Sequence, residues 1–418
     1  MLSDEVIDKV IERLVRRIEQ GNTYVLEQIG KSIKKIGTLS PSKAQQLVQI
    51  MRYGGDYDKI TKRLAEITEL NIKDIKKIFQ EVAKTDYQFA EQFYKYRNKK
   101  YIKWDENHAL KKQVDALATL TEKEYRNLSN TTAFATHNKK GKVVYNSIAR
   151  TYQNTLDEAV LNVGQGKETF DDATYRIMKE LVNSGIRSVN YESGKSLRLD
   201  SAIRMALQGG LRTLHNEMQQ QLGKEFDADG VEISVHSFPA PDHAEAQGRQ
   251  FKNEEFNKLQ KIGVAKDYKD REINMHLERK RTKSTGLAFR PISEYNCYHY
   301  IFSIVLGVNK PLYSDEKLQE IITKNKNGFK FDGKKYTMYQ GTQLQRKLEL
   351  EIRKQKDMQI VGRAKNDKKM IYESQEKIRQ LTKKYNDLSK ISGLPTRVER
   401  MRVDGYSELA KSKLLWYN

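Results

Sequence analysis

Apolar residues recur at helical spacing through the first quarter of the chain. Seven aliphatic side chains form one broad face of the first predicted helix: Val6, Ile7, Val10, Ile11, Leu14, Val15 and Ile18. We expect Gly21 to end this helix, because glycine is common just after a helix C-terminus. The same spacing predicts further helices at about 23–36, 56–68 and 71–84. Residues 1–104 are therefore predicted to form a helical N-terminal module.

The next stretch, residues 105–228, continues this pattern in longer helices. Its clearest element is a helix over about 196–226, in which apolar residues return every three or four positions. Gly209 and Gly210 lie inside it, and each glycine lowers helix stability by about 1 kcal/mol relative to alanine. A kink or a close contact with another helix would explain them. Alternatively, the helix ends there and restarts.

The pattern changes at Gly230, where apolar and polar residues begin to alternate. Residues 231–235 are predicted to form a strand. Four of the six prolines and four of the seven histidines follow within a hundred residues, which indicates a loop-rich segment. Turn-forming residues at 325–328 and 332–333 predict a terminal hairpin. Residues 229–335 are therefore predicted to form a compact α+β module.

The last part of the chain, residues 336–418, is helical again. Heptad-like apolar spacing predicts two arms, at about 340–361 and 367–391, that pack as an antiparallel hairpin. Residues 331–418 carry 21 basic and 11 acidic side chains, a surplus of ten positive charges. The predicted fold class is thus α+β and predominantly helical, with a helical N-terminal half, a small α+β module and a basic C-terminal helical hairpin and tail.

Composition excludes several classes of protein. The 418 residues include one cysteine, Cys297, so an internal disulfide framework or a cysteine-rich zinc site cannot form. This fits a reducing compartment. No apolar stretch approaches the roughly 18 residues of a membrane-spanning helix. The chain starts with an acidic Ser-Asp-Glu sequence at residues 3–5, unlike the basic start of a signal peptide. We therefore expect no membrane span and no signal peptide.

The formal net charge is +21 at pH 7, which is typical of proteins that bind nucleic acids. Part of this surplus has a compositional source, because Lys, Asn, Ile and Tyr are abundant, as in proteins from AT-rich genomes. The segment 93–104 interleaves aromatic rings with cations, a pattern that suits stacking on bases and contact with phosphates. Its candidate DNA-binding residues are Lys95, Arg97, Lys99, Lys100 and Lys103. The alternative is a surface helix whose tyrosines pack on neighbouring elements.

The signatures of the common enzyme classes are missing from the sequence. It has no phosphate-binding loop, no G-x-G-x-x-G after a strand, no H-E-x-x-H and no G-x-S-x-G. We therefore expect a protein that is not an enzyme, with no catalytic residues and no cofactor.

One group of residues could nevertheless carry chemistry: His236, Asp242, His243, Cys297 and His299. Imidazoles, a carboxylate and a thiolate could bind Zn²⁺, and the histidines with Asp242 could serve a metal-dependent nuclease. The spacing matches no metal signature, so we expect structural roles. Residues 241–245 would then start a short helix, the histidines at 236 and 299 would form hydrogen bonds, and the cysteine would pack in the core.

Three segments, in this order, resemble the phage minor capsid protein 2 family, which is related to the Mu F-like head morphogenesis proteins. Residues 234–251 resemble the family's S-x-H…R-P-x-H-A-x-x-Q-G pattern, residues 296–299 its N-C-R-H element, and residues 335–354 its C-terminal helical stretch. Together they cover about 230–395. The residues that carry the resemblance are His236, Pro241, His243, Gln247, Gly248, Asn296, Cys297 and His299.

The sequence departs from the family pattern at two positions. Ala240 and Tyr298 stand where the family has arginine. If those arginines contacted a phosphate or a carboxylate, that contact is lost or moved in this chain.

The resemblance implies a non-enzymatic virion component of a tailed bacteriophage. Such proteins meet the portal and major capsid proteins in the host cytoplasm and join the head near the portal vertex. By this resemblance, residues 105–228 dock on the portal and residues 229–335 form the Mu F-like module. The protein would act in head assembly and in DNA packaging or ejection, with packaged double-stranded DNA as a further partner. The alternatives are a DNA-binding protein ejected with the genome and a metal-dependent nuclease.

Overall fold

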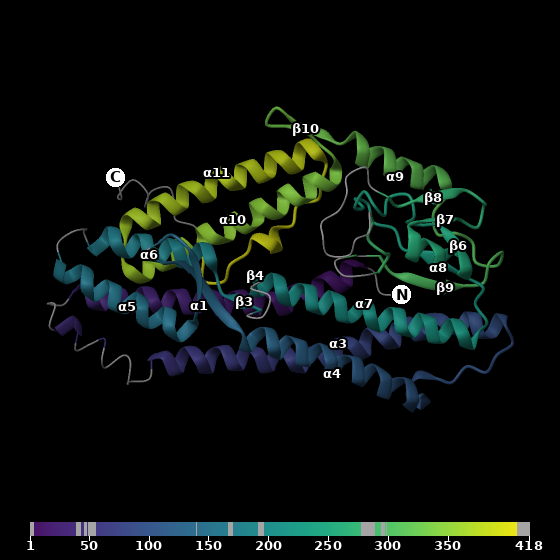
Figure 1. Cartoon of the computed structure of the whole chain (residues 1–418), viewed down its shortest axis with the longest axis horizontal. Coiled ribbons are helices and arrows are strands. Elements are labelled where there is room, and N and C mark those ends of the chain that lie inside the picture. Colours follow the sequence, from purple (N-terminus) through teal and green to yellow (C-terminus); the bar gives the residue numbers. More distant parts are fainter. Residues whose placement is uncertain are drawn as a thin grey trace.

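A computed structural model describes the chain at residues 4–38, 43–45, 48, 56–138, 140–165, 170–190, 196–276, 289–293, 297 and 299–407. Long helices lie side by side in an elongated body, and a smaller module of short strands and helices lies at one end of it (Figure 1). The predicted class, α+β and predominantly helical, is confirmed.

Helix α1 (Asp4–Gly37) runs through the middle of the helical body. Within the described residues, its main helix contacts are with α3 (Asp56–Tyr96), α5 (Ile148–Gln165), α6 (Phe170–Ser184), α7 (Leu199–Glu225) and α10 (Met338–Lys365). The predicted end at Gly21 is wrong, because the helix continues through it. A Cβ at this position would lie 3.0 Å from Leu64 Cδ2 of α3. Glycine at position 21 therefore allows two helices to approach closely.

Helix α3 is also continuous where two helices were predicted, at 56–68 and 71–84. The polar residue Asn71 lies in the middle of it and is buried. Its Nδ2 donates to the carbonyl oxygen of Leu14 at 3.1 Å and to the hydroxyl of Tyr125, on α4 (His108–Asn130), at 2.9 Å. The predicted break between the two helices therefore lies beside a polar residue that is paired inside the bundle.

A four-stranded antiparallel sheet lies within residues 105–228, which were expected to be helical throughout. Its strands, in the order β2-β1-β3-β4, are β1 (Thr132–His137), β2 (Val143–Ser147), β3 (Arg187–Val189) and β4 (Ser196–Arg198). Because β4 pairs with β3 from Val189↔Ser196 to Arg187↔Arg198, the helix predicted from 196 begins at Leu199. Two of the strands have only three residues, too few to show an alternating pattern.

The α+β module is built on a three-stranded antiparallel sheet in the order β6-β5-β9. The strand predicted at 231–235 is confirmed as β5. The elements of the module are β5 (Gly230–Ile233), β6 (Gln250–Lys252), α8 (Asn253–Ile262), β7 (Val264–Lys266), β8 (Glu272–Asn274), β9 (Ile301–Ile304) and α9 (Asp315–Asn327). The module has a separate apolar core that includes Phe251, Leu259 and Phe289.

The C-terminal elements agree with the prediction. Strands β10 (Phe329–Phe331) and β11 (Lys334–Tyr336) form the predicted hairpin, and α10 packs against α11 (Lys368–Ser392) as the predicted helical hairpin. Asn366 adopts a left-handed conformation, and the side chain of Asp367 caps α11 by accepting the Met370 N–H at 2.9 Å. A 3₁₀ turn, η2 (Val398–Met401), follows the hairpin.

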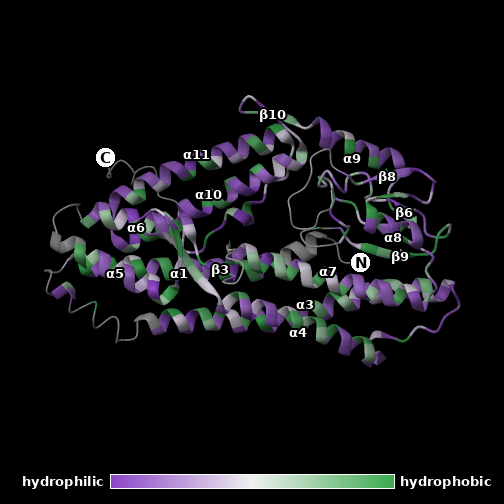
Figure 2. Ribbon diagram, viewed as in Figure 1, coloured by the Kyte–Doolittle hydropathy of each residue, from purple (hydrophilic) through white to green (hydrophobic). Residues whose placement is uncertain are grey.

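The largest hydrophobic core of the described residues joins the N-terminal helix to the C-terminal hairpin. It extends from Ile11 of α1 to Met370 of α11 and includes residues of α3 to α7 and of α10. Figure 2 shows that the long helices carry both hydrophobic and hydrophilic residues along their length, as amphipathic helices do. The division into units 1–104, 105–228, 229–335 and 336–418 stays a prediction.

Gly209 and Gly210 lie in the middle of a continuous α7, so the helix does not end and restart there. A Cβ at position 210 would overlap Thr121 Oγ1 of α4, whereas a Cβ at position 209 would meet only Arg212 Nη2, at 3.9 Å. The close helix contact offered as an explanation is confirmed for Gly210.

These surroundings predict opposite effects of two neighbouring substitutions. Gly210→Ala should lower the free energy of unfolding by about 1–3 kcal/mol, because the added methyl group overpacks the contact. Gly209→Ala should raise it by about 1 kcal/mol, because alanine favours the helix. Denaturant titration of both variants measures the two effects. Changes of the same sign would contradict the close helix contact assigned to Gly210.

A buried carboxyl group ties α1 to α10. Thr23 Oγ1 donates to Asp357 Oδ1 at 2.7 Å, and Asn22 Nδ2 donates to Asp357 Oδ2 at 3.3 Å. Asn22 Oδ1 accepts the N–H of Ile186, which precedes β3, at 2.9 Å. Burial raises the pKa of Asp357 from 3.8 to about 6, and the hydrogen bond from Thr23 opposes this change.

The raised pKa predicts a stability change with pH. The unfolded chain loses the Asp357 proton near pH 3.8, whereas the folded chain keeps it up to about pH 6. Rising pH across this interval therefore lowers the free energy of unfolding by about 3 kcal/mol through this group. Asp357→Asn does not titrate, so the stability of the wild type relative to the variant should fall between about pH 4 and about pH 7. Denaturant titrations over this range test it, and a constant difference would be inconsistent with the raised pKa.

Candidate functional site

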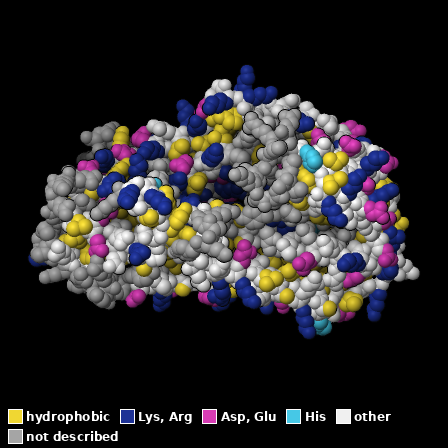
Figure 3. All heavy atoms as spheres, in the orientation of Figure 1, with side chains coloured by type: hydrophobic (Ala, Val, Ile, Leu, Met, Phe, Trp, Pro, Cys, Tyr) yellow, Lys and Arg dark blue, Asp and Glu magenta, His cyan; other side chains and the backbone are white. Residues whose placement is uncertain are grey.

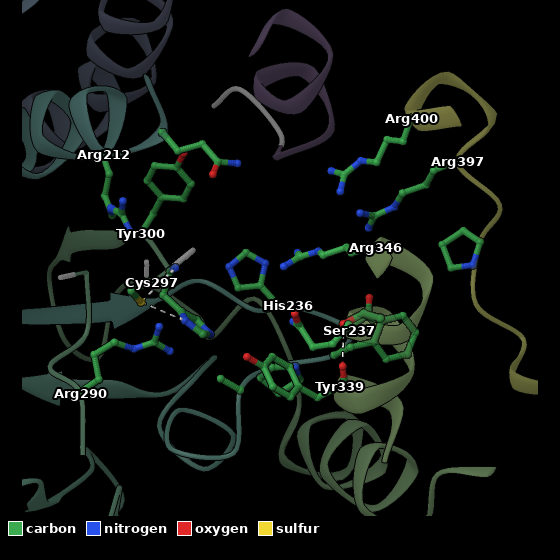
Figure 4. Close-up of a pocket in the computed structure, with 18 residues that line it drawn as sticks. Arg212, His236, Ser237, Arg290, Cys297, Tyr300, Tyr339, Arg346, Arg397 and Arg400 are labelled. Carbon is green, nitrogen blue, oxygen red and sulfur yellow. Dashed lines mark hydrogen bonds between the residues drawn. The ribbon is translucent and has the colours of Figure 1, made fainter. Parts of the chain in front are cut away.

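A cavity of about 320 Å³ lies where three parts of the chain meet. Helix α7 lines one side, loops of the α+β module line another, and α10 with the segment after α11 completes the wall (Figure 4). The described residues that line it include no Asp or Glu. They include five arginines: Arg212, Arg290, Arg346, Arg397 and Arg400.

The arginines reach the cavity from opposite sides. Arg346 extends toward His236, and Arg397 and Arg400 reach the same space from the segment after α11 (Figure 4). Arg290 lies on the module side, with its Nη2 3.5 Å from Asp242 Oδ1. Guanidinium groups bind phosphate and carboxylate through paired N–H donors. The chemistry of the lining therefore suits an anionic ligand.

The module wall of the cavity is shaped by the segment that follows β5. The Gly248 N–H donates to the Ile233 carbonyl at 2.8 Å, and the His236 N–H donates to Gln247 Oε1 at 2.9 Å. Gly248 has φ +71°, a left-handed conformation that favours glycine. Residues 241–248 form consecutive turns, so the short helix expected at 241–245 is wrong. Exposed Pro241 begins these turns, in which the His243 N–H bonds the Ala240 carbonyl at 3.0 Å.

Four of the candidate residues come together here. Cys297 Sγ lies 3.4 Å from His243 Nδ1 and 3.4 Å from His299 Nδ1, and all three residues are buried. The His236 ring lies 4.5 Å from the His299 ring, centroid to centroid. Asp242 is buried at the edge of this group and does not line the cavity. Asn296 and Tyr298 lie outside the described residues.

The surroundings shift the pKa values of two of these groups. Burial, followed by the neighbouring His236 and His243, holds the pKa of His299 well below its usual 6.5, so this imidazole is neutral. Burial also raises the pKa of the Cys297 thiol, against the effect of hydrogen bonds from the His299 and Ser293 backbone.

The predicted DNA-binding segment has a different setting. Its rings are partly enclosed: Tyr94 and Trp104 are buried, and Tyr101 stacks on Tyr87 at 5.0 Å. Its cations are in part paired, with Lys95 Nζ 2.8 Å from Glu91, Lys99 Nζ 2.7 Å from Asp227 and Arg97 Nη2 bonded to the Asp227 carbonyl. Lys100 and Lys103 are exposed. A role for the five cations in binding DNA stays a prediction.

The sequence did not reveal the arginine cavity. Arg212 and Arg346 lie on helices far apart in the chain. The surplus of positive charge in residues 331–418 indicates a basic segment, but it does not show which side chains line a cavity. Ala240, where the resemblance leads us to expect arginine, lines a cavity to which five other positions contribute arginines. On the face shown in Figure 3, Lys and Arg side chains are spread widely among Asp and Glu.

Comparison with known proteins identifies the family. Among the helices that the structure describes, none is long and apolar enough to cross a bilayer. Neither a curated protein nor a solved structure matches the chain. The family model of phage minor capsid protein 2 matches residues 2–390, nearly the whole sequence. The chain therefore belongs to the phage minor capsid protein 2 family.

Proposed function

We propose that this chain is a non-enzymatic structural component of the phage head that joins it at the portal vertex and acts in head assembly. Family membership makes it a minor capsid protein, a virion component that associates with other head proteins. The more specific proposal rests on one observation, an exposed apolar groove between the helical body and the α+β module. Association with the major capsid protein during assembly in the host cytoplasm is part of the same proposal.

The groove has a volume of about 770 Å³ and lies between α3 and the β5–β9 face of the module. Phe89 and Leu312 line it and are 42% and 75% exposed. His215 and Gln219 of α7 also line it, within the region that the resemblance assigns to portal docking. Exposed apolar surfaces of this kind mark protein interaction sites. We assign the groove to an apolar segment of the portal protein.

This assignment predicts the effect of single substitutions on portal binding. Leu312→Asp and Phe89→Asp should each weaken binding by about tenfold or more, because each removes an apolar contact and buries a charge. Leu120→Asp is the matched control, since Leu120 is 60% exposed on α4 and does not line the groove. Co-purification with portal-bearing procapsids measures the effect. Equal incorporation of all three variants would rule out this groove as the docking site.

A second candidate function, contact with packaged DNA during packaging or ejection, is favoured by the arginine cavity. Its described lining carries five arginines and no acidic residue, which suits phosphate groups. A nuclease that depends on Mg²⁺ has less support, because such a site needs carboxylate ligands and none lines the cavity in the described part of the chain.

Paired substitutions can test whether the arginine cavity or the segment 93–104 contacts DNA. Arg346→Gln with Arg397→Gln should reduce the slope of log affinity against log salt by about two, because each phosphate contact contributes about one unit. Lys100→Gln with Lys103→Gln removes the same charge from the exposed segment and should change the slope less. Filter binding to duplex DNA at several salt concentrations measures both. Binding that does not depend on salt would exclude a phosphate contact.

A further inference from the structure

The group formed by His243, Cys297 and His299 has the dimensions of a metal site. Their three ligand atoms, two Nδ1 atoms and one Sγ, all lie within 4.8 Å of one another. The two S···N distances are each 3.4 Å. In a tetrahedral zinc site with the usual Zn–S and Zn–N bond lengths, a sulfur and a nitrogen ligand lie about 3.5 Å apart. The two sulfur–nitrogen spacings therefore already match those of a zinc site.

Both imidazoles are held in the tautomer that binds metal through Nδ1. His243 Nε2 lies 2.7 Å from the carbonyl oxygen of Arg290, which can only accept, so this nitrogen carries the proton. His299 Nε2 lies 3.2 Å from Gln247 Oε1, which also accepts the His236 N–H. Each Nδ1 therefore directs a lone pair toward Cys297. Metal-binding histidines usually donate their outer N–H to an oxygen in this manner.

We propose that His243, Cys297 and His299 bind Zn²⁺ as three protein ligands, with the fourth position open to the arginine cavity. Cys297 and His299 line that cavity, which gives the fourth position access to water or to an oxygen of an anionic ligand. Three protein ligands with one open position distinguish reactive zinc sites from structural ones. On binding, the thiol loses its proton to solvent and the thiolate bonds the metal, which leaves the site with one positive charge.

The proposal goes beyond the role in head assembly and does not depend on it. It also differs from the expectation drawn from sequence, in which these residues are structural and no cofactor is bound. The spacing along the chain gave no signal, because 54 positions separate His243 from Cys297. His236, next to His299, lies outside the three-ligand group.

Cobalt provides a direct test, because a thiolate bound to Co²⁺ gives a charge-transfer band in the near ultraviolet. Cys297 is the only cysteine of the chain, so in the full-length protein this band reports one site. Titration of metal-free protein with Co²⁺ should produce the band, and added Zn²⁺ should abolish it. His243→Gln and His299→Gln should weaken binding by at least about tenfold. His276→Gln, an exposed histidine of the same module, is the matched control and should leave it unchanged.

X-ray absorption of the zinc-loaded wild type gives a second readout that needs no variant. It should show one sulfur at about 2.3 Å and two imidazole nitrogens at about 2.0 Å. Absence of the cobalt band in the folded wild type would overturn the proposal. A zinc shell without sulfur, or a band that survives both histidine substitutions, would also overturn it.

Discussion

The packing of α1 against α10 is the contact on which the rest of the structure depends. It joins the first described helix to the C-terminal hairpin across more than 300 residues of chain, and polar groups inside it fix the register. Asp357 accepts from Thr23 and Asn22. Arg353 pairs with Glu19 of α1 and with Asp200 of α7, the latter at 3.4 Å. Buried charges of this kind are tolerated only when they are paired, so alternative alignments of the helices are unfavourable.

This contact also creates the arginine cavity. Helix α10 carries Arg346, and the segment after the hairpin carries Arg397 and Arg400. Docking of the hairpin on the body therefore brings these three cations opposite the module loops. Part of this charge is balanced nearby, because buried Glu349 of α10 interacts electrostatically with all three of these arginines, and Arg290 Nη2 lies 3.5 Å from Asp242 Oδ1. The described lining of the cavity itself presents guanidinium groups and no carboxylate.

The module contributes a different chemistry to the same cavity. Residues of the family motif have specific tasks there: Gln247 bonds both the His236 backbone and the His299 ring, and Gly248 provides the left-handed turn. The resemblance to the family thus falls on residues that organise one buried site. On the face seen in Figure 3, in contrast, Lys and Arg side chains are spread widely and form no single stripe.

The sequence alone determined the elements whose signals are local. The α10–α11 hairpin, the β10–β11 hairpin and strand β5 follow from periodicity and turn residues within each segment. Where the role of a residue depends on a partner far away in the chain, the helix ends predicted from the sequence are wrong. Gly21 marks a close approach of α3 and not a helix end, and Asn71 is paired with α1 and α4.

Only the tertiary structure decided how the candidate site is composed. The motif residues could be named in advance, but not the convergence of His243, Cys297 and His299 on one point or the arrival of arginines from α7 and the C-terminal segment. These arrangements depend on contacts between residues far apart in the chain. Sequence periodicity reports which face of an element is buried, and it carries no information on which other element covers that face.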